Sequence, residues 1–289
     1  MTRTGERRQV GLKAQQRRVC ELAEAAEAQR HRACHRKSES LLRQALAIAA
    51  KSPGRDDLMV ATLLNNLAVV RKDQGRFAEA GRLYRRALTL LEQVLGPEHP
   101  ELASVYHNLG GLEHARGRHG RGELFARRSV AIREAELGPD HPDVAADLAA
   151  LAALLDGRGK HDEAERLYRR ALAVFERVFG PEHYEVAVNL NNLAVLHHAR
   201  GDAADAERLY RRALALKEKL LGPDHPDTAL TLNNLAVLCK ARGEPAAAAT
   251  LYRRALAVFE RALGGRHPKT AACRSNYRRL LRETARSRG

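Results

Sequence analysis

Tryptophan is absent from this 289-residue sequence, and the aromatic residues together make up only 4% of it. Hydrophobic residues still reach 44%, an ordinary share for a globular protein, which argues against wholesale disorder. A core with so few aromatics must be built from alanine, leucine and valine, which suit close-packed helices. Runs of valine, isoleucine and threonine, typical of strands, are missing. These absences favour an all-α fold.

Long hydrophobic runs are missing as well, since no stretch approaches the roughly 20 apolar residues that a membrane-spanning helix needs. The first 18 residues are basic but contain no apolar segment, so they do not resemble a secretory signal. The four cysteines have unrelated spacings and do not form a disulfide framework. A reducing, cytoplasmic location is therefore the expectation.

Acidic residues are outnumbered: 35 Asp and Glu against 50 Lys and Arg give a net charge of +15. Residues 1–18 and 271–289 each carry +5, so ten of the fifteen net charges lie at the two ends. We expect 1–18 to be a flexible basic segment and 271–289 to be a basic capping helix and tail. Clustered Lys and Arg of this kind also suit contacts with nucleic-acid phosphates.

One pattern recurs every 42 residues. The motif LYRRAL occurs at 83–88, 167–172, 209–214 and 251–256, and glycines recur in register at Gly96, Gly138, Gly180, Gly222 and Gly264. A fixed period of this size indicates a solenoid. We divide residues 19–270 into six units, 19–60, 61–102, 103–144, 145–186, 187–228 and 229–270, closed by a final helix.

Each unit predicts two helices. In the sixth unit, residues 229–242 and about 245–263 carry apolar residues at helical spacing. Gly243 and Gly264 are expected to end these helices, because glycine tolerates a positive φ. Small residues such as Ala194 and Ala236 recur where two helices must approach closely.

These small positions resemble those of a tetratricopeptide repeat. The fuller pattern, LNNLAVL with AERLYRRALAL and LGPDHPDTA, resembles the 42-residue repeats of kinesin light chains and their bacterial relatives over about residues 40–277. The resemblance implies a right-handed α-solenoid of helix-turn-helix units whose first helices line a concave groove. It also implies a protein-interaction module rather than an enzyme.

Two adjacent polar columns lie on the predicted first helices, with basic residues further along them. The candidate groove residues are Asn65, Asn66, His107, Asn108, Asn191, Asn192, Asn233, Asn234, Lys72, His198 and Lys240. An amide both donates and accepts hydrogen bonds, so such a column could bind the backbone of an extended peptide whatever its sequence. The alternative is that the asparagines only hold neighbouring helices together, and that the basic residues are solvated.

The fourth unit departs from this pattern. It has Ala149 and Ala150 in place of the asparagines, which predicts, with Ala153, a shallow apolar floor for a large ligand side chain. Drift in an alanine-rich sequence is the alternative.

Two properties of related proteins do not carry over. The cations with which chaperone-binding repeats hold a carboxylate are replaced by Thr62, Ser104, Ala146, Val188 and Leu230. Segment 1–40 also lacks the sustained heptads of a coiled coil that would join a motor.

Other conspicuous residues are interpreted structurally. Repeat geometry keeps the five loop histidines too far apart to share a metal, so we expect them to cap the helices that follow: His99, His141, His183, His225 and His267. Cys239 and Cys273 are expected to fill small core positions. No nucleophile motif or phosphate-binding glycine loop occurs, so neither enzymatic activity nor a metal or cofactor is predicted.

The leading hypothesis is a scaffold or adaptor that binds an extended, acidic peptide or partner segment in the groove. The alternative is nucleic-acid binding through the basic ends, where Arg274, Arg278 and Arg282 share one helix face. The last helix of a solenoid also needs a polar outer face, which accounts for these arginines without a ligand.

Overall fold

The computed structural model describes residues 3–51 and 56–286, and all regular structure in these ranges is α-helical. The helices are α1 Arg3–His31, α2 His35–Lys51, α3 Asp57–Asp73, α4 Phe77–Leu95, α5 Leu102–Ala115, α6 His119–Leu137, α7 Pro142–Asp156, α8 His161–Phe179, α9 Tyr184–Arg200, α10 Ala203–Leu221, α11 Pro226–Ala241, α12 Pro245–Leu263 and α13 Pro268–Arg286. They correspond to six helix-turn-helix pairs followed by one further helix, so the predicted all-α repeat architecture is confirmed.

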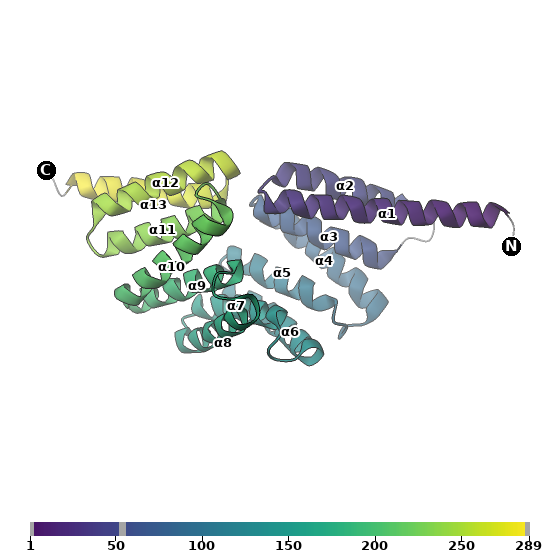
Figure 1. The fold of residues 1–289 in the computed structure, drawn as a ribbon, viewed down its shortest axis with the longest axis horizontal. Helices are drawn as coiled ribbons and strands as arrows, with labels where there is room; N and C mark the ends of the chain where they lie inside the picture. The colour runs from purple at the N-terminus through teal and green to yellow at the C-terminus, as the bar shows by residue number, and fades with distance from the viewer. Residues whose placement is uncertain (1–2, 52–55, 287–289) are drawn as a thin grey trace. The chain divides into compact units, whose positions relative to one another are not determined.

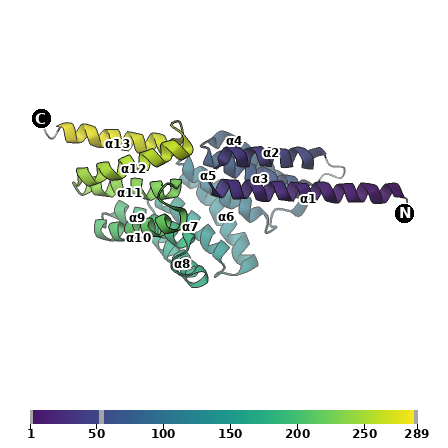
Figure 2. The ribbon, with the colours of Figure 1, turned by 45° about the horizontal axis from the view of Figure 1, so that its top comes forward.

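The chain divides into two compact units, residues 1–132 and 133–289. In the first unit, α1 packs on α2 and α3 on α4, and α2–α3 and α4–α5 contacts join successive pairs. In the second unit the pairs are α7–α8, α9–α10 and α11–α12, and α13 packs on α12. Figures 1 and 2 show α11, α12 and α13 side by side.

The described part of the basic N-terminal segment is helical. From Arg3 onward it belongs to α1, which continues to His31, while the expected flexibility of residues 1–18 stays a prediction. Alanine, glutamate, glutamine and arginine dominate α1, and these residues have high helix propensity. At the other end, α13 contains most of the predicted capping segment, and residues 287–289 lie outside the described ranges.

The helix boundaries follow the local signals. Gly243 and Gly264 follow α11 and α12 with φ of 76° and 86°, a region in which residues with a side chain are strained. Each loop histidine accepts a hydrogen bond at Nδ1 from the backbone N–H two residues later, at 3.1–3.3 Å. The predicted capping role is therefore confirmed for His141, His183, His225 and His267, whereas His99 binds Glu101, which precedes the first residue of α5.

The small residues lie where helices cross most closely. Ala152, Ala194 and Ala236 have no exposed surface, and a side chain added at Gly110 would place its Cβ 3.5 Å from the Ala126 Cβ. The tyrosine of LYRR fills the space beside them, since Tyr84, Tyr168, Tyr210 and Tyr252 are all buried. Cys239 and Cys273 are buried too, as predicted.

This close packing can be tested on α9. Ala194→Leu adds three carbons at a fully buried contact, so we expect a loss of about 1–3 kcal/mol in the free energy of unfolding. Urea denaturation followed by circular dichroism measures it. Ala199→Leu, at an exposed position of the same helix, is the matched control and should change stability by less than about 0.5 kcal/mol. Equal effects of the two substitutions would contradict the packing assignment.

Candidate functional site

The first helices of successive pairs contact one another and carry the predicted groove residues. In the first unit α3 contacts α5, and in the second unit α7 contacts α9, α9 contacts α11, and α11 contacts α13. The structure therefore places Asn65, Asn66, Lys72, His107 and Asn108 together on α3 and α5. It places Asn191, Asn192, His198, Asn233, Asn234 and Lys240 together on α9 and α11.

The asparagines bind one another between repeats. Asn108 Nδ2 donates to Asn65 Oδ1 at 3.0 Å, and Asn234 Nδ2 donates to Asn191 Oδ1 at 3.4 Å. Both bonds join residues 43 apart, from the second column of one repeat to the first column of the repeat before it. We call these bonds the asparagine ladder. They favour the structural interpretation of Asn65 and Asn191.

The side chain of Asn191 is both buried and fully hydrogen-bonded at its oxygen. It is only 4% exposed, and its Oδ1 also accepts from Thr231 Oγ1 at 3.1 Å. An amide oxygen has two lone pairs, so Thr231 and Asn234 satisfy this one completely. Asn191 has no acceptor capacity left for a ligand at that atom.

Asn192 differs from its neighbour. It is half-buried, and its side chain makes no hydrogen bond within the residues that the structure describes. The ladder would pair it with position 149, where the chain has Ala149 rather than asparagine. The loss of that acceptor leaves the Asn192 amide available beside the half-buried Ala149, Ala150 and Ala153 of α7.

The asparagine ladder is interrupted a second time at Asn233, near the C-terminus. Asn233 Oδ1 is buried without a hydrogen-bond partner, while Asn233 Nδ2 lies 3.4 Å from Asn234 Oδ1. In the ladder register Asn276 of α13 would donate to Asn233, but the hydrogen bond of the Asn276 side chain is one that its Oδ1 accepts from Arg279 at 3.4 Å. An unsatisfied buried carbonyl costs about 1–3 kcal/mol, so this position favours any donor that reaches it.

The basic residues of the predicted groove are less available than their sequence suggests. Lys240 Nζ pairs with Glu283 of α13 at 2.7 Å. Burial disfavours the charged imidazolium and lowers the pKa of His198, so this side chain is neutral at pH 7. Lys72 extends from α3 toward α5, with its Nζ 3.6 Å from where a Cβ on Gly111 would lie.

Sequence reasoning missed one polar group, Lys217 of α10. It is 2% exposed, and its Nζ donates to Thr231 Oγ1 at 3.1 Å and to the Asp227 carbonyl at 3.4 Å. Burial lowers the Lys217 pKa to about 8. A signal was present, since the positions in register with Lys217 include the buried Leu91, Phe175 and Phe259.

Asp227 lies beside this lysine at the start of α11. Burial alone would raise the pKa of Asp227, but the charges of Lys269 and Lys217 and the Tyr184 hydroxyl hold it below its usual value. The Tyr184 hydroxyl donates to Asp227 Oδ2 at 2.8 Å. Lys217, Thr231 and Asn191 thus form a continuous buried chain that connects α10, α11 and α9.

Known proteins resemble this chain through its repeats. The model of the tetratricopeptide repeat family matches residues 19–80, 59–135, 125–177, 151–219 and 185–261, which together span most of the sequence. The chain belongs to the tetratricopeptide repeat family. Repeats of this family typically form protein–protein interaction modules and are generally non-catalytic.

Solved structures place this tetratricopeptide repeat protein near kinesin-light-chain-like proteins. The crystal structure of BtubC (BKLC) from P. vanneervenii is 27% identical, with a TM-score of 0.55, over 88% of this chain and 94% of that one. A Podosopora anserina protein described as a kinesin light chain with nearly identical TPR-like repeats is 24% identical, with a TM-score of 0.54, over 71% of this chain and 97% of that one. No curated protein sequence matches the chain.

Two further properties concern the described residues only. No helix in residues 3–51 and 56–286 has both the length and the apolar character needed to cross a membrane. In the same ranges, no group of three or more His, Cys, Asp or Glu side chains is arranged to hold a metal ion.

The two asparagines of α9 are expected to respond differently to truncation. Asn191→Ala leaves the Asn234 amide without its acceptor and the Thr231 hydroxyl with only the Asp227 carbonyl at 3.4 Å, and should lower the free energy of unfolding by about 1–3 kcal/mol. Asn192→Ala removes no internal hydrogen bond and should change it by less than about 0.5 kcal/mol. Urea denaturation of the two variants measures the difference. Equal losses would show that Asn192 is also structural.

Lys217 makes stability depend on pH. Its pKa of about 8 in the folded protein is below the ordinary 10.5, so between these values the unfolded chain binds more protons and stability rises with pH. The full shift corresponds to about 3 kcal/mol. We therefore expect the wild type to gain free energy of unfolding relative to Lys217→Met between pH 8 and pH 10, measured by urea denaturation.

The control for this comparison is Lys219→Met, on the exposed side of the same helix. The free-energy difference between this variant and the wild type should stay constant over the same pH interval. A pH-independent difference for Lys217→Met as well would contradict the depressed pKa.

Proposed function

We propose that this tetratricopeptide repeat protein binds an extended segment of a partner protein across α7, α9 and α11, and acts as a scaffold or adaptor. The observation that supports this proposal is the unpaired amide of Asn192 beside Ala149, Ala150 and Ala153. These residues combine a hydrogen-bonding side chain for a peptide backbone with an apolar floor for one large side chain.

Val195 adds to the apolar character of this face. It lies one turn after Asn192 on α9 and is 37% exposed. A ligand that covered Val195 and the alanine floor would gain about 25 cal/mol for each Å² of apolar surface removed from water. Backbone hydrogen bonds to Asn192 would then orient the segment.

Fewer observations support an acidic ligand than support an extended one. It rests on the chain's net charge of +15, because Lys240 is already paired with Glu283 and His198 is held neutral by burial. The predicted groove residues of the first unit form a separate part of the proposal. They are Asn65, Asn66, His107, Asn108 and Lys72. In the second unit, Asn233 and Asn234 of α11 are the further asparagines proposed to contact the segment.

The experiment is a capture of proteins from nuclease-treated lysate of the native host, with the bound proteins identified by mass spectrometry. Ala149→Asp places a charge on the apolar floor and is combined with Asn192→Ala. We expect the double variant to lose, by about tenfold or more, the partners that the wild type captures, because a charge in a desolvated contact is strongly disfavoured. Ala246→Asp, at an exposed position of α12, is the control and should capture them normally.

A follow-up with the captured partners tests the extended form of the ligand. Overlapping synthetic peptides from each partner should include one that binds with an affinity close to that of the whole protein. Equal capture by wild type and double variant would place the interface elsewhere on the array.

Nucleic-acid binding is the second candidate, and one observation supports it. Arg274, Arg278, Arg279 and Arg282 surround a cavity of about 490 Å³ along α13. Arg274 is partly engaged, since it pairs with Glu260 at 2.7 Å. Loss of all capture after nuclease digestion would favour this function over the groove.

A further inference from the structure

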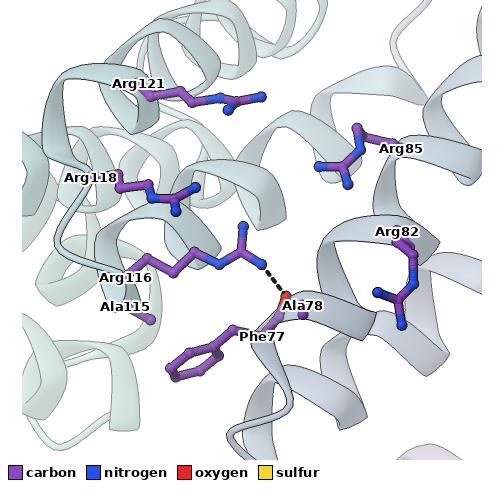
Figure 3. A pocket seen from close by; sticks show the side chains of 8 residues that line it. All are labelled: Phe77, Ala78, Arg82, Arg85, Ala115, Arg116, Arg118 and Arg121. Atoms are coloured by element: carbon purple, nitrogen blue, oxygen red, sulfur yellow. Dashed lines mark hydrogen bonds between the residues drawn. The ribbon is translucent and has the colours of Figure 1, made fainter.

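Five arginines gather around one cavity in the first unit. The cavity measures about 890 Å³ and is lined by the start of α4, the end of α5 and the start of α6. Its lining residues are Phe77, Ala78, Arg82, Arg85, Ala115, Arg116, Arg118 and Arg121, which include no acidic residue. Figure 3 shows Arg116, Arg118 and Arg121 extending from one side of the opening and Arg85 from the other.

These arginines have few internal partners. Arg116 is 3.0 Å from the buried Glu113 and donates to the Phe77 carbonyl, and Arg118 is 3.9 Å from the same Glu113. Arg82, Arg85 and Arg121 are exposed and make no ion pair within the described part of the chain. The Glu113 carboxylate is therefore the one acidic partner of the five guanidinium groups within the described residues.

Other repeats show which partner Arg85 lacks. Three residues in register with it, Arg127, Arg169 and Arg211, each pair with a glutamate four residues earlier at 2.8, 2.5 and 2.6 Å. In the repeat of Arg85 that glutamate is replaced by Gly81, and in the sixth repeat Arg253 has Ala249 at the same position. What distinguishes the site of Arg85 is that Arg116, Arg118 and Arg121 line the same opening.

The same substitution affects Arg116. Its counterpart Arg200 pairs with both Glu165 and Asp162, which stand 35 and 38 residues before it. The corresponding positions before Arg116 are Gly81 and Ala78, so Arg116 has neither acid, whereas Arg242 keeps Glu207 at the first position and has Ala204 at the second. The Arg116 guanidinium lies against Gly81, where an added Cβ would be 3.3 Å from Nη2.

The α6 side of the cavity has gained positive charge. Arg121 occupies the position held by Glu79, Glu163 and Asp205 in other repeats. Arg121 also lies in the first turn of α6, where the helix dipole favours a negative charge. Two positions that carry an acid in several other repeats, those of Gly81 and Arg121, therefore lack it around a single opening, and one of them carries an arginine instead.

We propose that this arginine cluster, defined by Arg82, Arg85, Arg116, Arg118 and Arg121, is a binding site for a phosphoryl group. A phosphoryl group carries nearly two negative charges and three acceptor oxygens, which match the paired N–H donors of several guanidinium groups. The compact arrangement suits one multiply charged group. A nucleic-acid strand would instead need a row of cations and aromatic side chains for its bases, and Phe77 is the one aromatic lining residue. The arginine cluster shares no residue with the proposed peptide groove, so this proposal does not depend on that groove.

Isothermal titration calorimetry of the full chain tests this site with two phosphoryl probes. The first probe is tripolyphosphate, and the second is a peptide with two adjacent phosphoserines, compared with its serine form. Arg82→Ala/Arg85→Ala/Arg121→Ala should weaken binding of the preferred probe by about tenfold or more, because charge-assisted hydrogen bonds to phosphate are lost. The control triple variant, with the same change in charge at exposed positions of the second unit, is Arg166→Ala/Arg253→Ala/Arg266→Ala and should bind within about twofold of wild type.

A second variant keeps every arginine. Ala78→Asp restores an acid in register with Asp162, and should weaken binding about as strongly as the triple variant. Its control is Ala204→Asp, at the corresponding exposed position of α10. Circular dichroism melting confirms that all variants fold.

The outcomes separate the sources of the phosphoryl group. Tighter binding of the phosphopeptide than of tripolyphosphate would indicate a phosphorylated partner segment, and the reverse would indicate a free oligophosphate. The proposal is overturned if neither probe binds, or if the cluster and control variants lose affinity equally. It is also overturned if a single-stranded RNA binds more tightly than both probes and is lost with the same cluster variants.

Discussion

The whole array depends on the close approach of helices at small residues. A helical pair of this kind has an apolar stripe that it cannot bury alone, so each pair must be covered by its neighbour. Ala152, Ala194 and Ala236, without exposed surface, allow that approach in three successive repeats. Because packed interiors tolerate little change in volume, the small residues also hold each repeat at a constant register against the next.

A constant register makes polar contacts recur at constant sequence separations. The asparagine ladder joins residues 43 apart in both units, and arginine–glutamate pairs join residues 35 apart, as in Arg200–Glu165 and Arg242–Glu207. Exposed ion pairs of this type contribute little to stability individually. Their importance here is that they neutralise side chains that would otherwise be available to a ligand.

Local features of this fold were predictable from the sequence, and contacts between repeats were not. The histidine caps and the glycines after helices involve residues within a few positions of each other, so their chemistry is visible in the sequence itself. The bond from Asn234 to Asn191 depends on how far one helix is shifted along the next, which periodicity alone does not determine. The pairing of Lys217 with Thr231 was missed for the same reason, and the part of α1 before residue 19 was not predicted because helix propensity outweighed the absence of an apolar pattern.

Departures from the repeat pattern are therefore the most informative positions in this protein. Where a repeat keeps its partners, asparagine binds asparagine and arginine binds glutamate, and little remains for a ligand. At Ala149 the acceptor for Asn192 is lost, and at Gly81 the glutamate that pairs with counterparts of Arg85 and Arg116 is lost. The groups left over differ in chemistry, one a neutral amide beside alanines and the other a cluster of guanidinium groups. Loss of a partner residue in one repeat thus yields one surface suited to a peptide backbone and another suited to a concentrated negative charge.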